Sequence, residues 1–256
     1  MKSGTGKYIY RRPESLTAAP THYCSGCGHG TVHRLIAEVV DELGIREKVV
    51  GVAPVGCAVL AYDYFNFDVC EAPHGRPPAV ATGMKRFRPD LVVFTYQGDG
   101  DLAAIGTAEI IHAANRGERI TVVFVNNGIY GMTGGQMAPT TLIGQKTRTT
   151  PRGRDVALTG PPLKVCEVLA QLDGTGYIAR GALDTPGNVL KTKKYVHRAF
   201  ENQLSGKGLA LVEILSPCPT YWALSPRQSM RRITEVVIPQ FPLGVIKDGG
   251  EVGVKP

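Results

Sequence analysis

The chain has 256 residues, 43% of them hydrophobic and 20% charged, and at this length a protein can bury a full core. Its 29 basic and 22 acidic residues leave a net charge of +7, which suits a nucleic acid, an acidic protein or an anionic cofactor equally. Six cysteines are too few for a disulfide scaffold, and no apolar run reaches the roughly 18 residues of a membrane span. Because the first residues lack an apolar signal region, we expect a cytoplasmic protein.

Helical and strand patterns alternate along the chain. Residues 1–22 are expected to form an irregular arm, residues 23–225 one domain, and residues 226–256 a tail able to lie on a partner. Apolar spacing predicts helices over 31–43, 79–87, 102–116, 163–172 and 187–204, and strands over 48–55, 91–97, 120–125, 176–180 and 208–215. This order predicts an α/β fold with a mainly parallel sheet and helices on both faces.

Two polar motifs follow neighbouring predicted strands. Gly98-Asp99-Gly100 ends one strand, and Asn126-Asn127 ends the next along the chain. In a parallel sheet both motifs lie at the edge where α/β folds bind ligands. A carboxylate, an amide oxygen and a later backbone carbonyl suit Mg²⁺, and glycines let the backbone approach phosphate groups. A lone Gly-Asp-Gly is more often an ordinary turn, but the two motifs together favour a metal–diphosphate site.

Four cysteines lie near the ends of predicted elements. They are Cys24, Cys27, Cys57 and Cys218. A Cys-x-x-Cys pair by itself could be a redox pair, half a zinc site or half an iron–sulfur site. One local pair with two remote cysteines is unusual for a zinc ribbon, which uses two local pairs. Cys166 lies in an apolar helical pattern, and we expect it to be a packed thiol, as we do Cys70.

The two polar motifs together are typical of thiamine-diphosphate enzymes. The stretch Asn127 to Gln136 (NGIYGMTGGQ) further resembles the beta subunit of 2-oxoacid:ferredoxin oxidoreductases, in the 2-oxoisovalerate and 2-oxoglutarate branches. The likeness extends over most of the chain and implies a thiamine-diphosphate-binding fold. It also implies that Mg²⁺ is held by Asp99, Asn127 and the carbonyl of Ile129. By the same likeness, the diphosphate lies against Gly100, Asp101, Gly131, Met132 and Thr133.

The resemblance also implies a role for the cysteines and for two other loops. Through the strings CSGCG, VGC and SPCPT, it implies one 4Fe–4S cluster held by Cys24, Cys27, Cys57 and Cys218. Further cofactor contacts are implied at Gly56, Cys57, Ala58, His74, Gly75 and Arg76. Arg76 could instead form a surface ion pair, and His74 could be a hydrogen-bonded loop histidine. For His29, beside the first cysteine pair, structural and functional roles are equally open.

The implied reaction is the oxidative decarboxylation of a 2-oxoacid with coenzyme A to acyl-CoA and CO₂, with electrons passing through the cluster to ferredoxin. In this family the cofactor sits between two units, and the second unit supplies an activating Glu. We therefore expect that catalytic group from an alpha subunit, with gamma or delta subunits as further partners. Some members carry a Lys where this chain has Leu60. An apolar residue there favours a branched-chain substrate such as 2-oxoisovalerate over 2-oxoglutarate or pyruvate.

Two other functions stay open. A non-redox thiamine-dependent decarboxylase or lyase would need Asp99 and Asn127 but not the cysteines, and a binding subunit could use the cysteines for structural zinc. Gly4 to Lys7 lacks the spacing of a phosphate-binding loop. A helix face carrying Lys191, Lys193, Lys194 and Arg198 could be merely solvated or could contact coenzyme A phosphates. No base-stacking or groove-reading motif accompanies the positive charge, so nucleic acid is not expected.

Overall fold

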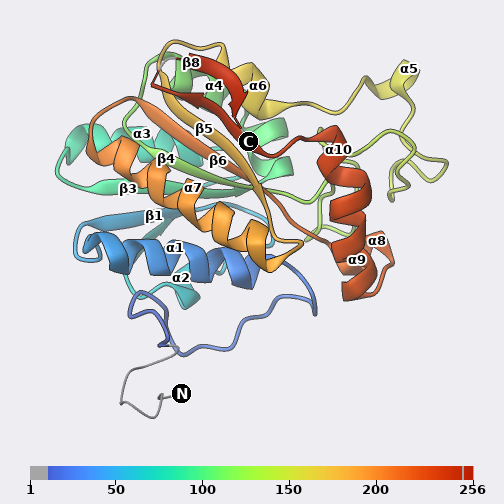
Figure 1. The fold of residues 1–256 in the computed structure, drawn as a ribbon, viewed down its shortest axis with the longest axis horizontal. Coiled ribbons are helices and arrows are strands. Elements are labelled where there is room, and N and C mark those ends of the chain that lie inside the picture. Colours follow the sequence, from blue (N-terminus) through green and yellow to red (C-terminus); the bar gives the residue numbers. More distant parts are fainter. Residues whose placement is uncertain (1–10, 250, 256) are drawn as a thin grey trace.

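An eight-stranded sheet forms the centre of the molecule, which the computed structural model describes over residues 11–249 and 251–255 (Figure 1). The strands lie in the order β2-β1-β3-β4-β6-β5-β7-β8. All neighbouring pairs from β2 to β5 are parallel, and β7 and β8 are added antiparallel. The bounds are β1 (Val49–Ala53), β2 (Asp68–Glu71), β3 (Val92–Gly98), β4 (Thr121–Asn126), β5 (Thr175–Ala182), β6 (Leu209–Leu215), β7 (Gly244–Asp248) and β8 (Glu251–Lys255).

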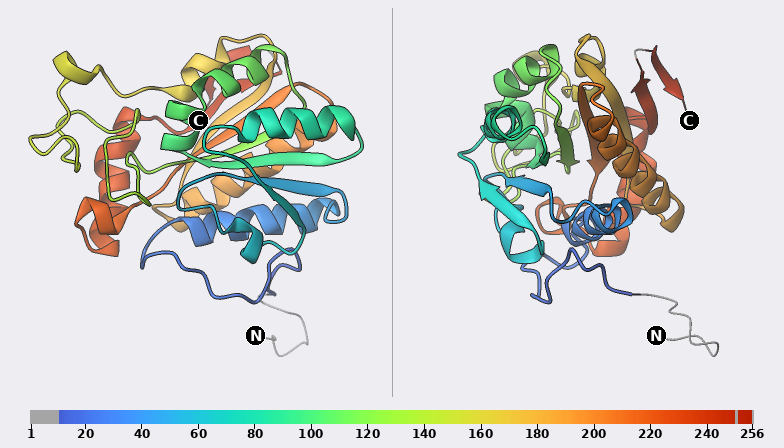
Figure 2. Two further views of the ribbon diagram at one scale, coloured as in Figure 1. Left: turned by 180° about the vertical axis from the view of Figure 1, so that it is seen from behind. Right: turned by 90° about the vertical axis from the view of Figure 1, so that its left-hand side faces the viewer.

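Helices cover both faces of the sheet, which confirms the predicted fold class (Figure 2). Helices α1 (His29–Leu43) and α7 (Pro186–Leu204) pack on one face, and α3 (Pro77–Phe87), α4 (Thr107–Asn115) and α6 (Val165–Ala170) pack on the other. The remaining helical segments are α2 (Ala61–Tyr64), η1 (Asp101–Ile105), α5 (Val156–Thr159), α8 (Pro219–Trp222), α9 (Pro226–Arg232), η2 (Ile233–Val237) and α10 (Ile238–Gln240).

Strand β4 shows why the sheet is buried on both sides. Val123 and Val125 pack toward α1 and α7, whereas Val122 and Phe124 pack toward α3, α4 and α6. Successive side chains of a strand point to opposite faces, so a continuous apolar run becomes a strand covered on both sides, as parallel sheets require. The core strands thereby hold their carboxyl ends at one edge, where the polar motifs lie.

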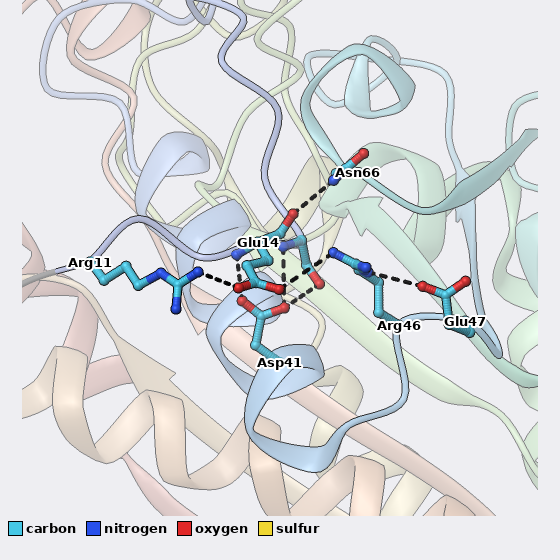
Figure 3. Close-up of polar contacts among 7 residues, drawn as sticks. Arg11, Glu14, Asp41, Arg46, Glu47 and Asn66 are labelled. Atoms are coloured by element: carbon cyan, nitrogen blue, oxygen red, sulfur yellow. Dashed lines mark hydrogen bonds and ion pairs between the residues drawn. The ribbon is translucent and has the colours of Figure 1, made fainter.

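Residues 11–22 lack regular structure but are tied to the domain. The carboxylate of Asp41, near the end of α1, accepts hydrogen bonds from the amide of Glu14 at 2.6 Å and the amide of Ser15 at 3.1 Å (Figure 3). Arg46 pairs with Glu14 at 3.7 Å, and the amide of Thr17 donates to the carbonyl of Tyr64 at 2.9 Å. The Gly4 to Lys7 motif lies outside the described residues.

The segment after residue 225 differs from the predicted tail. It forms α9, η2 and α10, and β7 then pairs antiparallel with β5. Ile246 is buried in the core on the α3, α4 and α6 face, and Phe241 is buried among Leu142 and Leu215. These short elements lack the long periodic runs by which helices and strands are predicted, so their apolar residues give no sequence pattern of their own.

Two further differences from the predicted elements lie after β1 and after β3. The predicted loop over 56–78 contains α2 and the half-exposed edge strand β2. The helix predicted over 102–116 begins with the π-helical turn η1 and continues as α4 after Gly106. Such π-turns are frequent at functional sites. No helix in the described ranges is both long and apolar enough to cross a bilayer.

Candidate active site

The candidate site lies at the carboxyl edge of the sheet, where the strand order reverses. From β1 the chain passes to β2 on one side and then to β3 on the other, and ligands of open α/β sheets bind at such reversal points. A cavity of about 480 Å³ opens there. Its walls are formed by His29, 54–58, His74, 98–101, Ile105, Asn127, 129–133 and Gln136.

Asp99, directly after β3, is an almost fully buried carboxylate, with 3% of its surface exposed. Its oxygens accept hydrogen bonds from the amide of Gly100 at 2.9 Å, the amide of Ile129 at 3.1 Å and the hydroxyl of Thr140 at 2.9 Å. Burial raises the pKa of Asp99 to about 6, although these hydrogen bonds oppose the shift. No lysine or arginine is paired with Asp99 among the described residues, so its negative charge would be stabilised by a bound cation.

Asn127 brings a second oxygen to the same place. The amide of Ile129 donates both to Oδ2 of Asp99 and to Oδ1 of Asn127, each at 3.1 Å. Trp222 holds this turn from the other side, because its indole N–H donates to the carbonyl of Asn127 at 3.1 Å. A buried carboxylate and an amide oxygen that converge beside this cavity form a donor set that fits Mg²⁺.

The residues expected against the diphosphate line the same cavity. Gly100, Asp101, Gly131, Met132 and Thr133 are all among its walls. A β-carbon on Gly100 would lie 2.6 Å from ring atoms of Tyr130, so glycine is required for the close approach of these two segments. Tyr130 itself lines the cavity and donates from its hydroxyl to the carbonyl of Gly100 at 3.3 Å.

Asp101 acts through its side chain on the loop before α3. Its Oδ1 accepts from the amide of Gly75 and from Nδ1 of His74, both at 2.9 Å, and its Oδ2 accepts from Gln97 at 2.5 Å. Gly75 has φ +80°, and a β-carbon there would lie 2.7 Å from the backbone of Gly106. The carboxylate therefore ties the loop to the end of β3 and orients His74, which lines the cavity.

Arg76 does not line the cavity. It immediately precedes α3, donates to the carbonyl of Ile105 at 2.7 Å and forms an ion pair with Glu109. The structure thus places Arg76 in the ion-pair arrangement that was the alternative to cofactor contact. Gly56, Cys57 and Ala58 do line the cavity, from the loop after β1.

Four thiols gather beside the cavity. A β-carbon on Gly131 would lie 3.1 Å from Sγ of Cys57 and 3.8 Å from Sγ of Cys218. Cys24 and Cys27 share one tight turn, in which the amide of Cys27 donates to the carbonyl of Cys24 at 3.0 Å. Ionisation of Cys57 would be opposed by Cys27 and Cys24, and that of Cys218 by Cys27 and Cys57. The predicted ligands are therefore electrostatic neighbours.

The protonation of these thiols bears on what they could bind. Burial, with smaller contributions from neighbouring cysteines and Asp99, raises the pKa of Cys57 to about 11 and that of Cys218 to about 12. Four thiolates so close together need a cationic centre among them, since a bound metal deprotonates its thiol ligands. No three His, Cys, Asp or Glu side chains in the described part of the chain enclose a site for a single metal ion. Four thiolates are the ligand set that a 4Fe–4S cluster takes, so the chemistry of these donors suits such a cluster.

His29 forms one wall of the cavity next to the first cysteine pair. Its Nδ1 forms a hydrogen bond with the hydroxyl of Tyr96 at 2.5 Å, and its ring stacks on Tyr23 with centroids 4.9 Å apart. Burial lowers the pKa of His29 to about 4, so the ring is neutral at pH 7. His29 therefore combines a structural hydrogen bond with a position on the cavity wall.

Arg154 is a site-supporting residue that the sequence did not reveal. Its guanidinium is buried and donates to the carbonyls of residues 138, 139, 141, 159, 160 and 161. This arrangement closes the base of the long loop after β4. Thr140 and Thr141 on that loop donate to Asp99 and to the carbonyl of Gly128. The only sequence signal is an arginine within a run of threonines and glycines.

The remaining sequence candidates lie away from the cavity. Cys166 is fully buried and its Sγ contacts Glu213 at 3.0 Å, whereas Cys70 lies on β2. Lys193 forms ion pairs with Glu38 and Glu42, and Arg198 pairs with Asp248. Leu60 precedes α2 and does not line the cavity.

Comparison with known proteins identifies a thiamine pyrophosphate enzyme domain in this chain. The family model "Thiamine pyrophosphate enzyme, C-terminal TPP binding domain" matches residues 55–214. The chain is 49% identical, over 94% of its length, to the ketoisovalerate oxidoreductase subunit VorA of Methanothermobacter thermautotrophicus, and it spans 53% of that protein, about half of its length. It is 39% identical, over 83% of its length, to the 2-oxoglutarate synthase subunit KorB of Methanocaldococcus jannaschii, of which it spans 74%.

A solved structure has the same fold. The 2-oxoglutarate:ferredoxin oxidoreductase from Magnetococcus marinus, with 2-oxoglutarate, coenzyme A and succinyl-CoA bound, matches with a TM-score of 0.72 and 30% identity. The match covers 83% of this chain and 69% of that one.

Proposed function

The chain belongs to the thiamine pyrophosphate enzymes, among the subunits of 2-oxoacid:ferredoxin oxidoreductases, and from this premise we propose that it is the thiamine-diphosphate-binding subunit of such an oxidoreductase. The proposed reaction converts a 2-oxoacid anion and coenzyme A into acyl-CoA, CO₂, one proton and two electrons. The observation that carries the proposal is that Asp99, Asn127 and Cys57 line one cavity, with the other three thiols gathered around Cys57. That combination joins a metal–diphosphate site to an electron-accepting one.

Each cofactor is assigned to residues of this chain. Asp99, Asn127 and the carbonyl of Ile129 would hold Mg²⁺, and the diphosphate would lie against Gly100, Asp101, Gly131, Met132 and Thr133. When bound, thiamine diphosphate supplies the electron sink for decarboxylation, while the protein supplies position and electrostatics. Cys24, Cys27, Cys57 and Cys218 would hold a 4Fe–4S cluster, which when bound would supply a one-electron acceptor.

The cavity needs a second unit to become a complete active site. Among the described residues that line it there are two aspartates and no glutamate. We propose that an alpha, pyrimidine-binding unit covers the cavity and supplies the activating Glu, with gamma or delta subunits as further partners in a cytoplasmic assembly.

A branched-chain 2-oxoacid, such as 2-oxoisovalerate, is the proposed substrate. No lysine or arginine is found among the described lining residues, so no cation is in place to pair with the second carboxylate of 2-oxoglutarate. The higher identity to the ketoisovalerate subunit than to the 2-oxoglutarate subunit supports the same choice. 2-Oxoglutarate remains the second candidate, because the solved neighbour holds it together with coenzyme A.

The test is a turnover assay of the complete enzyme, purified without air. Each 2-oxoacid is offered with coenzyme A and a viologen dye, and we expect the fastest reduction with a branched-chain acid. Cys57→Ala should abolish dye reduction, whereas the matched variant Cys70→Ala, on β2, should not. Full turnover by Cys57→Ala without dye reduction would instead establish a non-redox thiamine-dependent decarboxylase.

A further inference from the structure

A buried ion pair lies behind the turn that follows β4. Arg180 on β5 and Glu213 on β6 are register partners in the sheet, and at most 1% of either residue is exposed. Nε of Arg180 donates to Oε2 of Glu213 at 2.7 Å. Strands β4, β6 and β5 are neighbours in that order (Figure 1), so Glu213 lies between Arg180 and the end of β4. The last residue of β4 is Asn126, which precedes the proposed magnesium ligand Asn127.

The carboxylate of Glu213 fixes the orientation of the Asn126 amide, because its oxygens act only as acceptors. Oε2 accepts from Arg180 and, at 3.0 Å, from the thiol of Cys166. Oε1 accepts from Nδ2 of Asn126 at 2.7 Å, which directs Oδ1 of Asn126 to the amide of Gly128 at 3.1 Å. A reversed amide would bring two acceptors together at one end and two donors together at the other.

This hydrogen bond shapes the turn, residues 126–129, that presents the proposed magnesium ligands. The bond from the amide of Gly128 to the side chain of Asn126 closes an Asx turn around Asn127. Gly128 has φ +68°, a conformation that glycine adopts without steric cost. Asn126 is 2% exposed and does not line the cavity, so it acts on the site through the backbone of this turn.

The stability of the fold alone does not account for the ion pair. Phe124, Ile178 and Leu211 each precede one of the three polar residues by two positions on its strand, and all three belong to the apolar core under α6. In such a place the cost of desolvating two charges offsets much of their attraction, and apolar residues of similar volume are often equally stable. A buried charge that holds a polar neighbour in one orientation supplies conformational specificity instead.

We propose that Glu213 is a positioning residue for Mg²⁺ binding. Through the amide of Asn126 it holds the turn that presents Oδ1 of Asn127 and the carbonyl of Ile129. This inference rests on the proposed function, which assigns Mg²⁺ to that turn. Glu213 does not itself line the cavity, and Arg180 fixes it from the side opposite to Asn126.

Exchange of donor and acceptor tests the proposal in the complete enzyme. In Glu213→Gln, Arg180 and Cys166 bind the remaining side-chain oxygen, so the new NH₂ group faces that of Asn126 and forces its amide to reverse. The double variant adds Asn126→Asp, which places an acceptor opposite the new donor and still offers an oxygen to the amide of Gly128.

The matched control is Glu167→Gln on α6. It weakens the other ion pair of Arg180, whose glutamate side chain is 38% exposed, and leaves Glu213 paired with Asn126. One readout is the calorimetric Kd of Mg²⁺ at fixed thiamine diphosphate. The other is hydrogen exchange of the Gly128 amide, followed by mass spectrometry in the enzyme freed of metal, with the Tm of each variant measured alongside.

We expect Glu213→Gln to weaken Mg²⁺ binding about tenfold and to speed exchange at Gly128 about tenfold, because one buried hydrogen bond is lost. The double variant should return the exchange rate close to that of the wild type. Exchange decides this rescue, because the added carboxylate also attracts the cation directly. The control should lower the Tm and leave both readouts unchanged.

Unchanged Mg²⁺ affinity or unchanged exchange in Glu213→Gln overturns the positioning role and leaves the proposed function standing. Equal losses in Glu167→Gln, or no recovery of exchange in the double variant, show that the ion pair acts only on the stability of the fold and also overturn the role. If Glu213→Gln fails to assemble, recovery of assembly and of slow exchange in the double variant supports the proposal, and failure of the double variant overturns it. A wild-type enzyme that binds no Mg²⁺ with thiamine diphosphate refutes the proposed function, whereas the exchange rates still show whether Glu213 orders the turn.

Discussion

Replacing Thr140 with valine removes a buried hydroxyl that donates to Asp99 at 2.9 Å. A hydrogen bond to a charged group contributes about 1.5–3 kcal/mol, and 1.36 kcal/mol corresponds to one pKa unit. The pKa of Asp99, which burial raises to about 6, is therefore expected to rise to about 7–8 in the metal-free variant.

The direction of the pH dependence follows because the cation binds the ionised carboxylate of Asp99 and not the protonated carboxyl group. The pKa of Asp99 is higher in the folded protein than in the unfolded chain, so ionisation of Asp99 lowers the stability of the fold as pH rises through that pKa. A cation that binds only the ionised carboxylate offsets this loss of stability. At pH 7 about nine-tenths of Asp99 is ionised with a pKa near 6, and about half to one-tenth with a pKa of 7–8. The affinity of Thr140→Val for Mg²⁺ should thus be about two- to tenfold lower at pH 7 and should approach that of the wild type by pH 9.

The assay is calorimetric titration of Mg²⁺ at fixed thiamine diphosphate between pH 6 and 9. Thr140→Ser keeps the hydroxyl and should follow the wild type. A deficit of equal size at every pH would show that Thr140 acts through geometry alone. Equal affinities throughout would show that the hydrogen bond to Asp99 has no part in cation binding.

Three other substitutions follow from the structure. Arg180 is buried between Glu213 and Glu167, so Arg180→Met should destabilise the protein by about 3–5 kcal/mol. Calorimetry should then show a Tm about 6–9 °C lower than that of the wild type. A decrease in Tm of less than about 2 °C would contradict this prediction. Gly100→Ala places a methyl group against Tyr130, and this overpacking of about 1–3 kcal/mol should weaken thiamine-diphosphate binding about tenfold. The double variant with Tyr130→Ala should recover part of the lost affinity. If it recovers none, the methyl group does not act by clashing with the Tyr130 ring. Cys57→Ala should lose iron but still bind Mg²⁺ and thiamine diphosphate, measured by metal analysis and calorimetry; retained iron would exclude Cys57 as a ligand.

The parallel sheet was predictable because its strands and covering helices have long apolar patterns. The run from Leu91 to Gln97 is wholly apolar or aromatic but for Thr95 and Gln97, and in the structure it forms the interior strand β3. The placement of Asp99 and Asn127 at one edge follows from parallel strands alone. Residues that line a site through the backbone, such as Gly100 and Gly131, could be named only by family likeness.

The parts that could not be predicted depend on contacts distant in sequence. Arg154 and Thr140 support the metal site through hydrogen bonds within an irregular loop, which has no periodicity to reveal it. β7 is a strand because β5 offers it an unpaired edge, and its own five residues carry no distinctive pattern. Arg76 is close in sequence to His74, which lines the cavity, but its guanidinium forms an ion pair with Glu109 on α4.

The central claim is that one chain binds both the thiamine cofactor and an electron-accepting cluster at a single cavity. The most direct measurement is metal and cofactor analysis, with electron paramagnetic resonance after addition of 2-oxoacid and coenzyme A, on the complete enzyme purified without air. We predict about four iron atoms and one thiamine diphosphate for each copy of this chain, and a reduced-cluster signal that appears only with substrate and is absent in Cys57→Ala. A colourless preparation that holds zinc and gives no such signal would contradict the claim.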